Sequence, residues 1–197
     1  IFLTEGGTET EIMYRHGFDL PHFSMLPLLD NSKAMAKLSD MYRQYLDVVA
    51  EHRLCALIGG MDYRASPDWG ALLGYSVQGV AQANLRAVDF LRDIAKPYRN
   101  HIDQILIQGL IGPRGDAYAH NETITANEAE DYHSAQLITL KDADVDIAVA
   151  LTFNNVSEAI GVIRAAKALG LPIAVSLTLD SHSQLKSGMS LASAIEE

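Results

Sequence analysis

Charged and hydroxyl-bearing side chains are concentrated shortly after the apolar run Leu54–Gly59. Within the next few positions the chain carries Asp62, Tyr63, Arg64, Ser66, Asp68 and Trp69. Such a density of reactive groups is unusual for a simple connection and predicts a functional loop. The carboxylate of Asp62 could also work together with Glu5 as an acid-base pair. The competing interpretation, a turn in which Trp69 covers one end of the fold, suits Pro67 and Trp69 well.

A second candidate region follows the first apolar run, Ile1–Thr4, and reads Glu5-Gly6-Gly7-Thr8. The glycines permit positive φ angles and let a ligand approach the main chain closely, although a tight turn alone would use them equally well. Thr152 and Thr178 close two later apolar runs. Thr178 points into a shared site if the strand phase holds, but a β-favouring residue at a strand end is at least as good an interpretation.

The loop that begins at Gly109 contains Arg114 and Asp116. The guanidinium of Arg114 could pair with the carboxylate or pteroyl tail of a ligand, or it could brace the loop through an ion pair with Asp116. We favour the brace. His120 and His133 are not spaced with a third ligand, so structural roles explain them better than a metal site does.

The elements that must position these residues alternate along the chain. Short apolar runs predict five strands, at Ile1–Thr4, Leu54–Gly59, Gln104–Gly109, Ile147–Thr152 and Pro172–Thr178. Helical spacing and capping residues predict helices at about 31–52, 76–98, 125–142 and 155–169, with another beginning near Ser190. Thr125 and Glu128 have the spacing of a capping box.

Repeated strand-helix units predict an α/β fold with a parallel sheet, and residues 1–197 need be only one domain. Periodicity alone fits either an open doubly wound sheet or part of an eight-unit barrel. Gly6 and Gly7 are not followed by the third glycine of a dinucleotide-binding fingerprint, which weakly disfavours the first alternative. In a barrel, the chemistry belongs at the carboxyl ends of the strands.

Four motifs together resemble the homocysteine S-methyltransferase family: the Gly-Gly-Thr turn at 6–8, the aromatic-x-Ala-Ser turn at 63–66, Gly-Pro-x-Gly at 112–115, and Glu158-Ala159. The resemblance runs across essentially the whole chain and implies a parallel (β/α)8 TIM barrel. This chain would cover about its first five β/α units, because a full barrel needs about 250 residues. We therefore predict a single, truncated barrel domain of the homocysteine-binding type.

The resemblance implies a substrate site formed by Glu5, Gly6, Asp62, Tyr63, Arg64, Ser66, Thr152 and Thr178. The family usually has Asp where this chain has Glu5, in a position that looks suited to hold the amino end of homocysteine. Two departures bear on the acceptor. Asp62 follows Met61 where family members commonly have Asn-Thr, and Leu151 precedes Thr152 where many have a Glu that contacts the amine.

The implied activity is transfer of a methyl group from S-methylmethionine or S-adenosylmethionine to the zinc-activated thiol of homocysteine, giving methionine. The family's zinc ligands are three cysteines on later strands, so we expect them beyond residue 197 and expect these residues alone to be inactive. Cys55, the single cysteine, matches none of them. The alternatives are a diverged non-catalytic barrel that binds a small amino-acid-like ligand, and a carboxylate-based barrel lyase or hydrolase using Glu5 and Asp62.

The formal net charge of −10, with no long basic run, argues against nucleic acid and favours small-molecule partners. A single cysteine in an apolar run fits a reducing compartment, so we expect a cytoplasmic protein. No apolar stretch approaches the roughly 20 residues that a membrane span needs. Homo-oligomerisation stays open.

Overall fold

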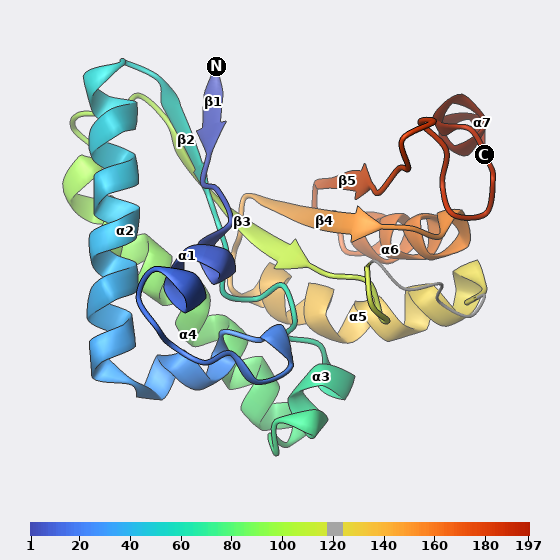
Figure 1. Ribbon diagram of the computed structural model, residues 1–197, viewed down its shortest axis with the longest axis horizontal. Helices are drawn as coiled ribbons and strands as arrows, with labels where there is room; N and C mark the ends of the chain where they lie inside the picture. Colours follow the sequence, from blue (N-terminus) through green and yellow to red (C-terminus); the bar gives the residue numbers. More distant parts are fainter. Residues whose placement is uncertain (118–123) are drawn as a thin grey trace.

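The computed structural model describes residues 1–117 and 124–197. Five parallel strands form one sheet in the order β1-β2-β3-β4-β5. The strands are β1 (Phe2–Thr4), β2 (Cys55–Ile58), β3 (Ile105–Ile111), β4 (Ile147–Phe153) and β5 (Ile173–Leu177). The sheet curls into a half-barrel with alternating helices, as Figure 1 shows, and this confirms the predicted partial TIM-barrel architecture.

The helices are α1 (Thr8–Tyr14), α2 (Ser32–Glu51), α3 (Pro67–Leu72), α4 (Val77–Ala95), α5 (Ala126–Asp142), α6 (Val156–Ala168) and α7 (Leu191–Glu196). Short 3-10 segments lie at Pro21–Phe23, Leu26–Asp30 and Lys96–Tyr98. Within the described ranges, every helix is too short or too polar to span a lipid bilayer.

Side-chain caps explain why the predicted helices begin where they do. Asn31 accepts from the amides of Lys33 and Ala34 at the start of α2, and Asn155 accepts from the amide of Glu158 at the start of α6. The predicted capping box at the start of α5 is confirmed, because the Thr125 and Glu128 side chains each bond the other's backbone amide.

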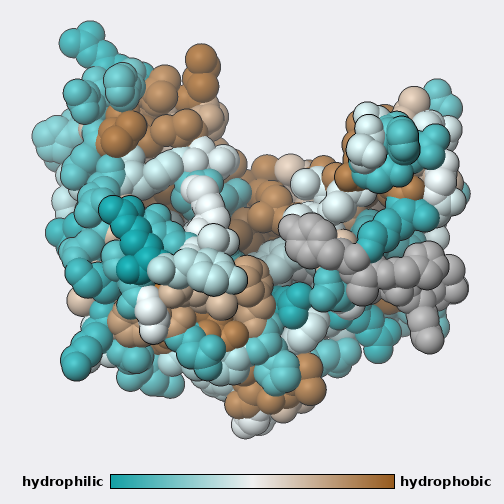
Figure 2. All heavy atoms as spheres, viewed as in Figure 1, coloured by the Kyte–Doolittle hydropathy of each residue, from teal (hydrophilic) through white to brown (hydrophobic). Residues whose placement is uncertain are grey.

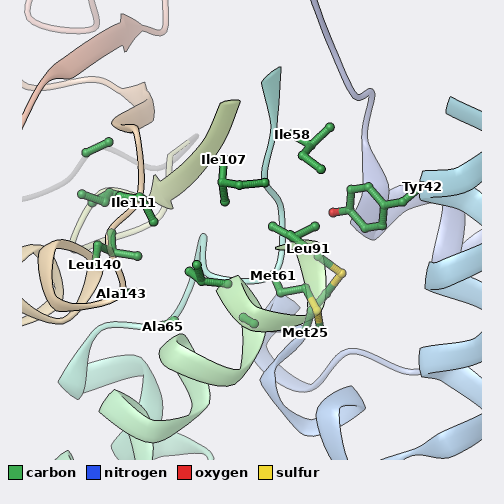
Figure 3. Close-up of a cluster of buried hydrophobic side chains, with 14 of the residues drawn as sticks. Met25, Tyr42, Ile58, Met61, Ala65, Leu91, Ile107, Ile111, Leu140 and Ala143 are labelled. Atoms are coloured by element: carbon green, nitrogen blue, oxygen red, sulfur yellow. The ribbon is translucent and has the colours of Figure 1, made fainter. Parts of the chain in front are cut away.

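The hydrophobic core lies between the sheet and the long helices on its convex side. Ile58 and Ile107 project from neighbouring strands towards Leu91 of α4 and Tyr42 of α2, as Figure 3 shows, and all four belong to one buried cluster. Burying apolar side chains of this size stabilises the fold by about 1.5–3 kcal/mol each. The helices therefore hold the strands in the curl that brings their carboxyl ends together.

Two helices were not predicted. The seven residues of α1 follow Gly7, which provides no side-chain cap, and α3 begins at Pro67 in a segment that reads as a turn. Both lie in loops that follow the carboxyl ends of strands, so they bear on the geometry of the site.

Candidate functional site

A cavity of about 790 Å³ opens on the concave side of the half-barrel. Figure 2 shows this hollow between the two arms of the molecule, with apolar atoms along its floor. Its described lining includes residues from β1 and its loop, the loop after β2, β3 and its loop, and β4: Glu5, Gly6, Glu9, Phe23, Tyr63, Arg64, Gln108, Leu110, Asp116, Leu151 and Thr152. Of the predicted site residues, the structure brings Glu5, Gly6, Tyr63, Arg64 and Thr152 to this wall.

Glu5 is held firmly on one side of its carboxyl group. Oε1 accepts from the backbone amide of Gly59 at 3.1 Å and from Nε2 of Gln108 at 2.8 Å, whereas Oε2 is buried without a hydrogen-bond partner among the described residues. Burial, opposed by these hydrogen bonds, raises the pKa of Glu5 to about 7. An acid that changes protonation near neutral pH, with one oxygen uncommitted, can accept a hydrogen bond from a cationic ligand.

Tyr63 and Thr152 meet across the cavity wall. The Tyr63 hydroxyl lies 2.5 Å from Oγ1 of Thr152, which also donates to the Leu151 carbonyl at 2.6 Å. The pairing of β4 with β5 shifts register between Ala150 and Phe153, and Thr152 adopts a φ of 59°. This irregularity places a β-branched residue in a left-handed conformation, which is uncommon and is typical of functional sites.

Asp62 and Ser66 belong to the same loop but are not among the described residues that line the cavity. Asp62 is 2 % exposed, and its Oδ2 accepts from the amide of Leu110 at 2.9 Å. Burial raises the pKa of Asp62 to about 7. Ser66 shares a hydrogen bond of 2.7 Å with the hydroxyl of Tyr132 on α5. Both side chains therefore fasten the loop to neighbouring elements, and the cavity wall does not present Glu5 and Asp62 as a carboxylate pair.

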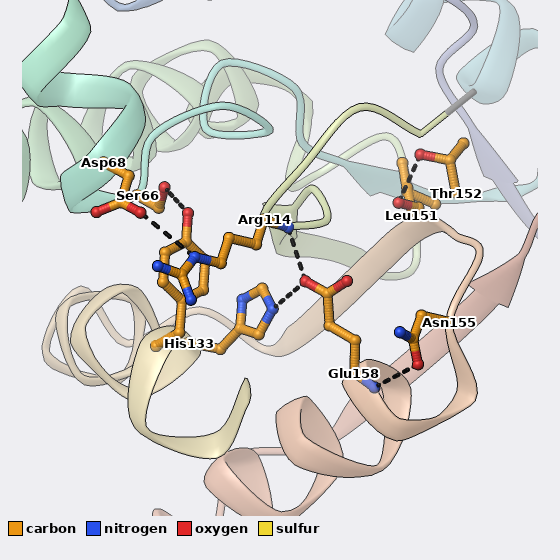
Figure 4. A network of polar contacts seen from close by, with 9 residues as sticks. Ser66, Asp68, Arg114, His133, Leu151, Thr152, Asn155 and Glu158 are labelled. Carbon is orange, nitrogen blue, oxygen red and sulfur yellow. Dashed lines mark hydrogen bonds and ion pairs between the residues drawn. The ribbon is translucent and has the colours of Figure 1, made fainter. Parts of the chain in front are cut away.

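A polar network, buried at His133 and Glu158, fixes the loop after β3, as Figure 4 shows. Oε1 of Glu158 accepts from the backbone amide of Arg114 at 2.7 Å and lies 3.0 Å from Nε2 of His133. The Arg114 guanidinium pairs with Asp68 at 3.5 Å and stacks over the ring of Tyr132. The favoured brace with Asp116 is therefore not what holds Arg114: its described ion-pair partner comes from α3, a helix that the sequence did not predict.

Thr178 lies just past β5, where its amide donates to the carbonyl of Phe153 at 2.7 Å. Its hydroxyl is buried without a partner among the described residues, and the described cavity lining does not include it. The structure thus places Thr178 at the strand end, as predicted, but outside the group that surrounds the cavity.

Gln108 is a site residue that sequence reasoning missed. It is 4 % exposed in the middle of β3 and donates to Glu5. A signal was available, since an amide within the otherwise apolar run Ile105–Ile111 must find a partner when it is buried. Glu9 and Phe23 were also missed, because the helix and the turn that carry them were not predicted.

No group of three or more His, Cys, Asp or Glu residues that could hold a metal ion occurs in the part of the chain that the structure describes. Cys55 is half-buried in β2, and His133 is occupied by Glu158. His120 lies outside the described residues. The side chains described here therefore do not fit a zinc site.

Comparison with known proteins gives two findings. A profile of the homocysteine S-methyltransferase family matches residues 2–197. Three solved structures of the homocysteine methyltransferase MmuM from Escherichia coli are also similar. The oxidized form gives a TM-score of 0.82 at 21% identity, with 100% of this chain and 68% of that chain covered. The metallated form gives 0.81 at 20%, covering 100% and 69%. The apo form gives 0.69 at 18%, covering 99% and 65%.

At these identities the likeness to solved structures establishes the fold alone, and the chain spans about two thirds of their length. A search of curated proteins found no match.

Proposed function

Because the chain belongs to the homocysteine S-methyltransferase family, we propose that its protein methylates the thiol of homocysteine to give methionine. The donor we propose is a small sulfonium, S-methylmethionine or S-adenosylmethionine. The acceptor sulfur forms a bond to the methyl carbon, the methyl-sulfonium bond breaks, and the donor leaves as a neutral thioether. The acceptor thiol gives up its proton in the process.

The observation that carries the proposal beyond the family match is the position of Glu5. Glu5 lines the cavity of about 790 Å³, and its buried Oε2 has no hydrogen-bond partner among the described residues, which leaves an acceptor for the ammonium group of an amino acid bound in the cavity. We assign to Glu5 the binding of that ammonium group, and to the Tyr63–Thr152 pair and the backbone at Gly6 contacts with the rest of the substrate. Asp62, Ser66 and Thr178 would act by supporting this wall.

Leu151 gives the diverged-binder alternative its support. It contributes an apolar side chain to the cavity beside Thr152, so this part of the wall offers no second acid for an ammonium group. Recognition of the acceptor's ammonium group would then depend on Glu5 more heavily than it does in a site with two carboxylates. The carboxylate lyase or hydrolase is less well supported, because Asp62 is turned away from the lining.

Zinc is the metal we propose for thiol activation, since a bound thiolate is a far better nucleophile than a thiol. The metallated form of MmuM supports a metal in this family. Because the described residues supply no ligand set, we assign no ligand in this chain and derive no step through the metal.

The protein environment we propose is the cytoplasm, with small molecules as partners and residues 1–197 acting as one domain. A single cysteine and a net charge of −10 support this setting, and the charge argues against nucleic acid. Homo-oligomerisation is compatible with these features.

Calorimetric titration of the intact protein with homocysteine tests the assignment of Glu5. At about pH 8, where Glu5 is ionised, Glu5→Gln should weaken binding at least about tenfold, because loss of one decade corresponds to ~1.4 kcal/mol. Glu51→Gln, at an exposed position near the end of α2, is the matched control and should bind like the wild type. Equal affinity of wild type and Glu5→Gln would overturn the role of Glu5, and absence of homocysteine binding by the wild type would overturn the proposed function.

A further inference from the structure

Arg64 is the only cation among the described residues that line the large cavity. The acids on the same wall include Glu5 and Glu9. An anionic group on a ligand would be repelled by these acids and attracted to Arg64. The charges on the cavity wall would therefore orient a ligand that carries both a positive and a negative group.

The Arg64 side chain is fixed without being neutralised. Its guanidinium carbon lies 4.1 Å from the ring centroid of Trp69 and 5.9 Å from that of Phe23, and Nη1 donates to the carbonyl of His22 at 3.1 Å. Among the described residues Arg64 makes no ion pair. Stacking and one neutral acceptor thus hold the charge in place for a partner that the chain itself does not supply.

Arg114, for which a ligand carboxylate was the less favoured of two predicted partners, is in the opposite situation. Its guanidinium is paired with Asp68 and stacked on Tyr132. It is also absent from the described lining of the cavity. A ligand carboxylate would have to displace Asp68 to reach it, whereas Arg64 is already on the wall.

The donors of Arg64 suit a carboxylate. A guanidinium carries five N–H groups, and only one of them is used by His22. A ring stacked on its face leaves the N–H edge free, and that edge matches the two oxygens of a carboxylate. The match is poorer for a neutral or purely apolar group, which would leave the charge desolvated and unpaired.

We propose that Arg64 is the subsite for the α-carboxylate of an amino-acid ligand. This inference rests on the proposed function, which makes both the acceptor and the donor amino acids. The carboxylate could belong to either one, so the experiment must separate the two sources.

The test compares each ligand with its decarboxylated counterpart on the intact protein. L-Homocysteine is paired with 3-aminopropane-1-thiol, and S-methyl-L-methionine with (3-aminopropyl)dimethylsulfonium. Arg64→Met should weaken binding of one parent ligand at least about tenfold and change its decarboxylated counterpart by less than about threefold. The parent ligand that is affected identifies the source of the carboxylate.

Two further variants keep the test decisive. Arg64→Lys retains the charge but loses the planar fork, so an intermediate and still carboxylate-selective loss is expected, even if Arg64→Met folds poorly. Arg114→Met is the matched control and should show no selective loss.

Equal losses for both members of each pair, no loss in either pair, or a selective loss in Arg114→Met would each overturn the Arg64 subsite. If wild type binds neither parent ligand, the proposed function fails and the subsite fails with it. If wild type binds a parent ligand but Arg64→Met does not weaken that binding, only the subsite fails.

Discussion

Glu5 and Asp62 are two buried acids with similarly raised pKa values but different roles. Both carboxyl groups are withdrawn from water, and each holds one backbone amide of a neighbouring strand end. Only Glu5 reaches the cavity wall. The sequence marked both positions as candidates, but the direction of a side chain in a loop depends on contacts with distant strands, which local patterns do not encode.

The raised pKa of Asp62 makes the stability of the fold depend on pH. Since the folded state holds the proton up to about pH 7 and the unfolded state releases it near its ordinary pKa of 3.8, the stabilising contribution is full below that ordinary pKa and is lost as pH rises towards 7. We expect the free energy of unfolding of wild type, relative to Asp62→Asn, to fall by a few kcal/mol between about pH 4 and about pH 8.

Urea denaturation at several pH values measures this difference. Asp103→Asn, at an exposed position, is the control and should track the wild type across the range. If the difference in free energy of unfolding between wild type and Asp62→Asn stays constant with pH, the burial of an ionisable group at this position is contradicted.

Thr152 carries a second consequence at the scale of one residue. At a φ of 59° glycine avoids the steric conflict that any side chain meets, so Thr152→Gly should be more stable than Thr152→Ala by about 1 kcal/mol. Both variants lose the hydroxyl contact with Tyr63, which removes that difference from the comparison. Thr139, within α5, is the matched site, where the order should reverse because glycine weakens a helix interior. Chemical denaturation of all four variants checks the result, and the same order at both sites would rule out the left-handed conformation.

At the scale of elements, the five strands and the five helices with clear capping or periodic signals were predictable. Asn31, Thr125 and Asn155 each marked a helix start that the structure confirms. What escaped prediction were α1 and α3, which are too short to show helical periodicity and have no side-chain cap. This omission hid Glu9 and the Asp68–Arg114 pair, so the predicted site was incomplete where short helices build it.

The contact between α5 and α6 depends on a glycine. A Cβ at Gly161 would lie 2.4 Å from Cβ of Ala129 and 2.5 Å from the carbonyl oxygen of Ala126. Although alanine favours helices, Gly161→Ala should therefore destabilise the protein by about 1–3 kcal/mol, because the two helices must separate. Thermal and urea denaturation should show the loss. Gly79→Ala, near the start of α4, meets only side-chain atoms at 3.3 Å or more and should change stability by less than about 1 kcal/mol. Equal effects at the two glycines would contradict close packing of α5 on α6.

At the scale of the whole molecule, the half-barrel brings residues from separate strands and loops onto one concave wall. Glu5, Arg64 and Thr152 come from loops or strands that are far apart in sequence, and the parallel sheet brings them around one cavity of about 790 Å³. The strand-helix alternation predicted this convergence, because the carboxyl ends of parallel strands share one edge. The depth of the wall and the choice of side chains facing it could not be predicted, since they depend on how the sheet curls.

The most direct test of the central claim is methyl transfer by the intact protein. Carbon-13-labelled homocysteine is supplied with S-methylmethionine or with S-adenosylmethionine, and the labelled products are followed by NMR. We predict that labelled homocysteine is converted to labelled methionine with at least one donor, and that Glu5→Gln converts it more slowly. Recovery of unchanged homocysteine with both donors, from a folded and metal-supplemented protein, would contradict the assignment as a homocysteine methyltransferase.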